Sequence, residues 1–200
     1  MLIGAFFAPL KLSRRCLGLW GQVLARIPRA RLVFSPTNPA YRDSYARLAA
    51  AAGIAPDRLL FLPQGRDEAE NQARYEMIDF VLDPMPYGGV NGTLEALDMG
   101  VPVVTLVGRR HGERASFSIL ASLGVTQTLA HSGREYVDIA VRLAGDPAFM
   151  RDVRTAIRSG LAGSPLTDMP GHARNLEAAY VQALRLKAPA ALDDAEAATG

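Results

Sequence analysis

The stretch 83–97 holds the residues best suited to chemistry, in a Pro- and Gly-rich run that leads from a buried strand into a helix. Asn91, Gly92 and Thr93 fall at the expected first turn of that helix. A helix N-terminus offers unpaired N–H groups and a positive dipole, and glycine lets the backbone approach a ligand closely. We therefore expect these residues, with the Thr93 hydroxyl, to hold a diphosphate, and Glu95 to accept hydrogen bonds from ribose hydroxyls.

An ordinary strand-to-helix turn is the alternative for the same stretch. Asn91 would then cap the helix, and Glu95 would be a charged residue near its start. The stretch matches neither the P-loop pattern nor the dinucleotide-binding fingerprint. Spacing alone leaves both interpretations open.

Lys11 lies just beyond the first apolar run, in the sequence Ala-Pro-Leu-Lys-Leu-Ser. A lysine at the carboxyl edge of the first strand would point into the same crevice, where its charge stabilises a leaving diphosphate. The alternative is a solvated loop lysine that begins a basic helix with Arg14 and Arg15.

Three further residues lie where a ligand at this edge would reach them. Tyr87, beside two glycines, would stack on a base or on an acceptor. His111, in a basic loop flanked by glycine, would touch the sugar or the acceptor, and Arg114 would approach the phosphate. The alternatives are a solvated loop for His111 and an ordinary helix start for Arg114.

Short apolar runs that alternate with amphipathic stretches provide the elements that position these residues. The expected strands are Leu2-Phe7, Arg31-Ser35, Leu59-Leu62, Phe80-Asp83 and Val101-Val107, and the helices that follow them are 15–26, 40–53, 67–77, 92–99 and 113–123. Several runs are continuously apolar, as in parallel strands buried on both faces. We predict an α/β fold with a Rossmann-like, doubly wound parallel sheet of about six strands, the last a short one within 126–130.

The chain is expected to form one domain over 1–187, with its last helices, about 133–187, packed on the sheet. The final stretch, 188–200, is rich in alanine and acids and lacks aromatic residues, so we expect it to be disordered.

Composition excludes several classes of protein. A net charge of +2 gives no argument for nucleic acid, and the single Cys16 forms no internal disulfide. No stretch approaches the roughly 20 apolar residues of a membrane helix. The charges after the apolar N-terminus favour a buried strand over a signal peptide, so we expect a cytoplasmic protein. Three scattered histidines and one cysteine have no metal-site spacing.

An ordered set of motifs resembles the C-terminal catalytic region of the O-GlcNAc transferase and SPINDLY-like glycosyltransferases. The motifs are Lys11-Leu12-Ser13, Pro63-Gln64-Gly65-Arg66, Asp83 with Asn91-Gly92-Thr93, Gly100 to Thr105, Gly108 to Ser116, Arg134 to Ala140 and Ser164-Pro165-Leu166. Together they cover most of 4–186 in the family's order.

The resemblance implies a GT-B architecture, in which two Rossmann-like domains face each other across a cleft. This chain would be the C-terminal, nucleotide-sugar-binding half. The resemblance implies that Lys11 contacts the donor diphosphate and that Asn91, Gly92 and Thr93 bind phosphate. It implies that Glu95 binds the ribose. It also implies that the loop with Gln64 and Arg66 lies near the uracil and that Arg74 lies near the nucleotide.

The resemblance also implies an activity, which is transfer of a sugar from a UDP-sugar, UDP-GlcNAc in the main family, to protein Ser or Thr. An N-terminal GT-B half or a helical-repeat (TPR) region and a protein acceptor would be the partners. No metal or other cofactor is expected, because no DxD spacing occurs near the loop.

The chain departs from the family pattern at three places. Val90-Asn91-Gly92-Thr93 stands where His-Thr-Thr-Gly is usual, Glu95 where Asp is usual, and Asn71 near an expected histidine. These changes resemble bacterial cytoplasmic N-glucosyltransferases, so UDP-glucose and an Asn acceptor are an alternative. A UDP-binding module without catalysis is another, since the acceptor half is missing. An NAD-dependent enzyme is weakened by the absence of G-x-G-x-x-G after the first strand.

Overall fold

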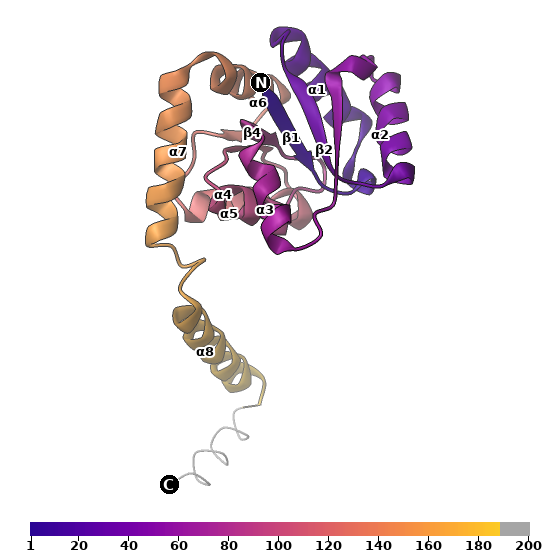
Figure 1. The fold of residues 1–200 in the computed structure, drawn as a ribbon. Coiled ribbons are helices and arrows are strands. Elements are labelled where there is room, and N and C mark those ends of the chain that lie inside the picture. Colours follow the sequence, from indigo (N-terminus) through magenta and orange to yellow (C-terminus); the bar gives the residue numbers. More distant parts are fainter. Residues whose placement is uncertain (189–200) are drawn as a thin grey trace. The chain divides into compact units, whose positions relative to one another are not determined.

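The computed structural model describes residues 1–188, which form strands and helices in alternation (Figure 1). The strands are β1 Leu2–Phe6, β2 Arg31–Thr37, β3 Leu59–Pro63, β4 Phe80–Leu82, β5 Val103–Leu106 and β6 Leu129–Ala130. The α-helices are α1 Arg14–Arg26, α2 Pro39–Ala51, α3 Glu68–Glu76, α4 Asn91–Asp98, α5 Ala115–Ser122, α6 Gly133–Gly145, α7 Pro147–Ala162 and α8 Met169–Lys187. Short 3-10 turns lie at Pro9–Lys11, Pro56–Arg58 and His111–Glu113.

The sheet has six strands in the order β3-β2-β1-β4-β5-β6, and every neighbouring pair is parallel. The predicted Rossmann-like parallel sheet is therefore confirmed. The order reverses between β1 and β4, because the chain moves outward from β1 in one direction and outward from β4 in the other. A ligand crevice is expected at the carboxyl ends of the strands at such a point.

Helices cover the sheet on both faces. Parallel crossovers are right-handed, so opposite directions of travel put α1 on one face and α4 on the other. α1 packs beside α6, and α4 packs beside α5. The strand interiors are correspondingly buried, with Ile3, Leu32, Phe34, Phe80 and Leu82 inaccessible to solvent.

Caps mark the ends of several helices. Gly53, Gly100 and Gly124 end helices with φ of 76°, 68° and 71°, a left-handed conformation that glycine adopts at little cost. Asp67 caps α3 by accepting a hydrogen bond from the Glu70 backbone N–H at 2.9 Å.

The region around β5 differs in detail from the sequence prediction. The strand covers 103–106 rather than 101–107, and the next helix begins at Ala115 rather than near Glu113. The cause is local, since the Glu113 carboxylate accepts hydrogen bonds from the backbone N–H groups of Arg109 and Arg110. These bonds shape a loop and a 3-10 turn before the helix.

The chain divides into two compact units, of which the first is Met1–Leu161 and the second begins at Ala162. The first unit contains the whole sheet, and α8 belongs to the second. One nucleotide-binding domain over 1–187 stays a prediction, and the expected disordered tail falls, apart from Ala188, outside the described residues. Within 1–188, no helix combines the length and apolarity that membrane crossing requires.

Candidate functional site

The reversal of strand order places a pocket of about 440 Å³ at the carboxyl ends of β1 and β4, within the first unit. This volume falls in the range of pockets that hold small ligands and cofactors. The segments that follow β1 and β4 form much of its wall, and α3, the segment before α3 and residues of β1, β2 and β4 also contribute. Eight of the predicted site residues line it, namely Lys11, Gln64, Arg74, Tyr87, Asn91, Gly92, Thr93 and Glu95.

The N-terminus of α4 opens on this pocket without a side-chain cap. By contrast, side chains of Ser13, Asn38, Asp67, Ser132 and Asp168 cap α1, α2, α3, α6 and α8. Among residues 1–188, no acceptor is found for the backbone N–H groups of Asn91 and Gly92. Unpaired N–H groups at a helix N-terminus are suited to bind an anion.

Close packing explains the glycines of this turn. A Cβ on Gly89 would lie 2.5 Å from the Thr93 hydroxyl oxygen, and a Cβ on Gly92 would lie 3.3 Å from the Phe6 carbonyl oxygen. The loop and β1 therefore approach each other more closely than larger residues allow.

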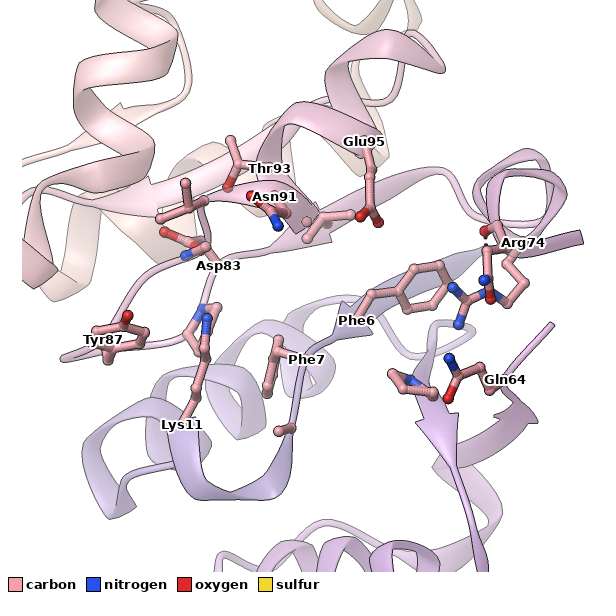
Figure 2. A pocket seen from close by; sticks show the side chains of 18 of the residues that line it. Phe6, Phe7, Lys11, Gln64, Arg74, Asp83, Tyr87, Asn91, Thr93 and Glu95 are labelled. Carbon is pink, nitrogen blue, oxygen red and sulfur yellow. Dashed lines mark hydrogen bonds between the residues drawn. The ribbon is translucent and has the colours of Figure 1, made fainter. Parts of the chain in front are cut away.

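Lys11 faces this turn across the pocket, as Figure 2 shows. Its ammonium donates a hydrogen bond to the Gly88 carbonyl at 3.2 Å and lies 4.6 Å from the centre of the Tyr87 ring. Burial lowers the pKa of Lys11, and the charge of Asp83 opposes that shift. The predicted juxtaposition of a lysine and a helix N-terminus is thus present.

The Thr93 side chain has a different environment from the one expected. It is 2% exposed, and its hydroxyl is 2.9 Å from the Ser116 hydroxyl on α5. Its backbone N–H donates to the Val90 carbonyl at 3.2 Å. These contacts engage the donors of Thr93 within the protein and fasten α4 to α5.

Glu95 points into the pocket one turn further along α4 (Figure 2). Its carboxylate accepts a hydrogen bond from the Tyr75 hydroxyl at 2.9 Å. Burial, and then the charge of Glu95, raise the pKa of Tyr75. A carboxylate has several acceptor positions, so Glu95 retains capacity for ribose hydroxyls.

Arg74 lies at the far end of the pocket, where α3 faces β1 and β2. It donates to the Ser35 hydroxyl and, at 3.0 Å, to the Asn71 carbonyl, and it lies 5.6 Å from the centre of the Phe6 ring. Gln64 and Asn71 line the same end, and the Asn71 side-chain oxygen accepts from the Gly65 N–H at 2.9 Å.

Three predicted residues do not line the pocket. Arg66 is exposed and pairs with Glu70 on α3. Arg114 donates to the Gly108 carbonyl at 3.1 Å and lies 4.3 Å from the centre of the Phe117 ring. His111 is exposed in the 3-10 turn after β5.

Asp83 lines the pocket, although the sequence analysis gave this residue no role of its own. Its carboxylate is buried directly after β4 and accepts hydrogen bonds from the Gly89 N–H at 2.7 Å and the Thr105 hydroxyl at 2.6 Å. Burial raises the pKa of Asp83, and these hydrogen bonds oppose the shift. The carboxylate thereby ties both ends of the loop 84–89 together. The signal was its position, a lone acid at the end of an apolar run.

A buried chain of hydrogen bonds supports the same loop from behind. The Trp20 indole N–H donates to the Tyr136 hydroxyl at 3.0 Å, and that hydroxyl donates to the Asp83 carbonyl at 3.0 Å. Residues of α1 and α6 therefore hold the end of β4. Over 1–188, no group of three or more His, Cys, Asp or Glu side chains is placed to hold a metal ion.

The strand order and the pocket at its reversal define a Rossmann-like α/β domain, of the kind that forms half of a GT-B glycosyltransferase. The sequence profile of glycosyl transferase family 41 matches residues 3–176, and the chain belongs to that family.

Individual relatives agree with this assignment. A protein of Oryza sativa subsp. japonica, described as a "Probable UDP-N-acetylglucosamine--peptide N-acetylglucosaminyltransferase SPINDLY", is 33% identical over 181 residues, 88% of this chain and 19% of the rice protein. A mutant O-GlcNAc transferase of Thermobaculum terrenum has a TM-score of 0.80 and 34% identity, over 90% of this chain and 35% of that chain. The chain thus spans only part of these relatives.

A more distant structure agrees on the fold alone. The C-terminal domain of a glycosyl transferase group 1 family protein (LpcC) from Francisella tularensis has a TM-score of 0.59 and 16% identity, over 80% of this chain and 84% of that chain.

Proposed function

We propose that this chain binds UDP-GlcNAc and forms the donor half of an enzyme that transfers the sugar to Ser or Thr of a protein. The observation that carries the proposal is the uncapped N-terminus of α4, which faces Lys11 across one pocket. Membership of glycosyl transferase family 41 and the activity named for the rice relative support it. The proposal includes a cytoplasmic location and no metal requirement.

The pocket suggests how the nucleotide would lie. The N–H groups of Asn91 and Gly92 and the Lys11 ammonium would hold the two phosphates. Glu95 would accept from the ribose, and the base would lie towards Gln64 and Arg74. This order puts the Lys11 ammonium and the N–H groups at the phosphates, and the Glu95 carboxylate at neutral hydroxyls.

Lys11 and the helix dipole would also assist the chemical step. As the acceptor oxygen forms its bond to the sugar, the hydroxyl proton would pass to solvent water. The bond from the sugar to the β-phosphate oxygen would break, and the electron pair of that bond would stay on UDP. The extra negative charge would then lie between the ammonium and the N–H groups, which are in place before the reaction. The acceptor would bind on an N-terminal half or repeat region, as the partial coverage of the relatives supports.

Calorimetry with UDP, UDP-GlcNAc, UDP-glucose and NAD tests the proposal. We expect UDP and UDP-GlcNAc to bind, and Lys11→Ala to weaken UDP binding about tenfold, or about 1.4 kcal/mol. Lys187→Ala, which removes an equal charge on α8, is the matched control and should bind UDP normally. UDP binding that is absent, or unaffected by Lys11→Ala, would contradict the proposal.

Transfer is tested separately by adding the N-terminal half of a relative to the chain and supplying a Ser-containing peptide. Sugar transfer from UDP-GlcNAc is the expected result. Transfer from UDP-glucose to Asn alone would favour the N-glucosyltransferase alternative, and UDP binding without transfer would favour a binding module.

A further inference from the structure

Three exposed arginines, Arg15, Arg109 and Arg110, lie near one another beside the pocket, and we call them the basic rim. Arg15 is in the first turn of α1, and the other two are in the loop after β5. Their common neighbour is Glu113. The backbone N–H groups of Arg110 and Arg109 are the main cause of its lowered pKa, and the charges of Arg110 and Arg15 add to it.

The basic rim carries an excess of positive charge. Among residues 1–188, none of its three guanidinium groups forms an ion pair with a carboxylate. Glu113 is the acid between them, and one of its oxygens already accepts from two backbone N–H groups, at 2.8 and 3.1 Å. The charges of Arg15 and Arg110 therefore act on one carboxylate that is partly engaged, and Arg109 adds a third exposed cation on the same loop.

The basic rim lies at the end of the pocket where the sugar would emerge. Figure 2 shows Gln64 and Arg74 at one end, and Lys11 and Tyr87 at the other. The loop of the rim joins this second end, because the Gly88 N–H donates to the Gly112 carbonyl at 3.1 Å. A nucleotide with its base near Arg74 and its phosphates near Lys11 would direct the sugar towards the rim.

A second cavity borders the nucleotide pocket. It has a volume of about 290 Å³, and Arg15, Met85, Glu113 and His131 are among its lining residues. Pro84 lines both this cavity and the nucleotide pocket. A polypeptide that presents a side chain to the sugar would therefore pass the rim and have room beside it.

We propose that the basic rim binds acidic side chains of the protein acceptor, next to the residue that receives the sugar. This inference rests on the proposed function for the direction of the nucleotide. Exposed charges steer an oppositely charged partner and select against like charges. Salt weakens such contacts, because the Debye length is about 8 Å at 0.15 M.

Fluorescence anisotropy of labelled peptides tests the inference on the whole chain saturated with UDP. Three peptides of equal length would hold one Ser among Asp and Glu, among Asn and Gln, or among Lys. At low salt we expect the acidic peptide to bind at least about fivefold more tightly than the neutral one, and the basic peptide most weakly. The preference should shrink as salt is added.

A matched pair of variants locates the preference. Arg15→Glu with Arg110→Glu should abolish it. Arg29→Glu with Arg31→Glu changes the net charge by the same amount and should preserve the preference. These two exposed arginines lie just before β2 and at its amino end, whereas the pocket lies at the carboxyl ends of the strands. Thermal melting checks that both variants fold.

Several results would overturn the inference. These are equal binding of the three peptides, no binding of any, a preference that survives Arg15→Glu with Arg110→Glu, and a preference lost equally in both variants. Tighter binding of a single-stranded oligonucleotide than of the acidic peptide would also reject a protein partner. Absence of UDP binding by the native chain would instead contradict the proposed function. If that chain still preferred the acidic peptide, the basic rim would remain a protein-binding surface.

Discussion

At the scale of single residues, Lys11 combines three properties that suit contact with a diphosphate. Its ammonium is partly withdrawn from water, it is positioned by the Gly88 carbonyl and the Tyr87 ring, and it faces unpaired backbone N–H groups. An ammonium held in this way needs little rearrangement when an anion binds. Its lowered pKa also makes its charge sensitive to pH.

The affinity for UDP should therefore fall in alkaline solution, at a pH below the usual lysine value of 10.5. Below its lowered pKa Lys11 is charged and binds phosphate, and above it the charge is lost. Lys11→Arg keeps its charge throughout this range, because arginine titrates above about 12. The ratio of native to variant affinity, measured by calorimetry at several pH values, cancels the titration of UDP itself.

Unfolding does not account for this expected fall. The unfolded chain binds the Lys11 proton up to a higher pH than the folded chain does, so this group makes the folded state more stable as pH rises through the window. A constant affinity ratio between neutral pH and pH 10 would contradict the assignment of Lys11 to the phosphates.

The sequence was sufficient to predict the placement of some residues but not of others. Lys11 and Asn91 were predicted to share a pocket because both follow strands at the carboxyl edge. The environments of Thr93 and Arg114 were not predicted, because they depend on Ser116 and Phe117 in a helix whose packing the local pattern does not specify. Arg66 pairs with Glu70 four residues later, which spacing permits but does not require.

At the scale of elements, the turn before α4 depends on glycine where its backbone approaches other groups. Gly89→Ala should destabilise the fold by about 1–3 kcal/mol, because the new methyl group would collide with the Thr93 hydroxyl. UDP affinity should fall as well, since the turn would shift. Urea unfolding and calorimetry measure the two effects.

Gly18→Ala is the control for this substitution. Gly18 lies inside α1, and a Cβ there would meet no atom within 4 Å. Alanine should stabilise that helix by about 0.5–1 kcal/mol. If Gly89→Ala were as stable as the native chain, the close approach at the turn would be contradicted.

The link between α1, α6 and the end of β4 gives a second prediction for the elements. Tyr136→Phe removes the hydroxyl that joins the Trp20 indole to the Asp83 carbonyl, leaving both without that partner. We expect a loss of about 1–3 kcal/mol in the free energy of unfolding, measured in urea. Tyr180→Phe, at a position 63% exposed on α8, should change stability little. Equal stability of the two variants would show that the buried chain contributes nothing.

At the scale of the whole molecule, the alternation of apolar runs and amphipathic stretches was sufficient to predict the fold class. It was not sufficient to predict strand order, because an apolar run indicates that a strand is buried and does not indicate which strand it pairs with. The handedness of the crossovers and the reversal between β1 and β4 then indicate where a ligand is expected to bind. The division at Ala162 was not predicted, because the periodicity of a helix indicates which of its faces is apolar and not which element that face packs against.

Within the second unit, α8 carries an apolar stripe that is exposed. Leu176, Tyr180, Val181 and Leu184 are between 37% and 63% exposed.

The chain covers 35% of the Thermobaculum terrenum enzyme, so the activity of the whole protein is a proposal.

The most direct test of the account is an NMR titration of the isotope-labelled chain with UDP, following individual backbone N–H signals. We predict large, saturable shifts for the N–H groups of Asn91 and Gly92, with an affinity that Lys11→Ala weakens. The signals of Gly53 and Gly124, which end α2 and α5, should stay in place. UDP binding that leaves the Asn91 and Gly92 signals unchanged would contradict an anion site at the N-terminus of α4.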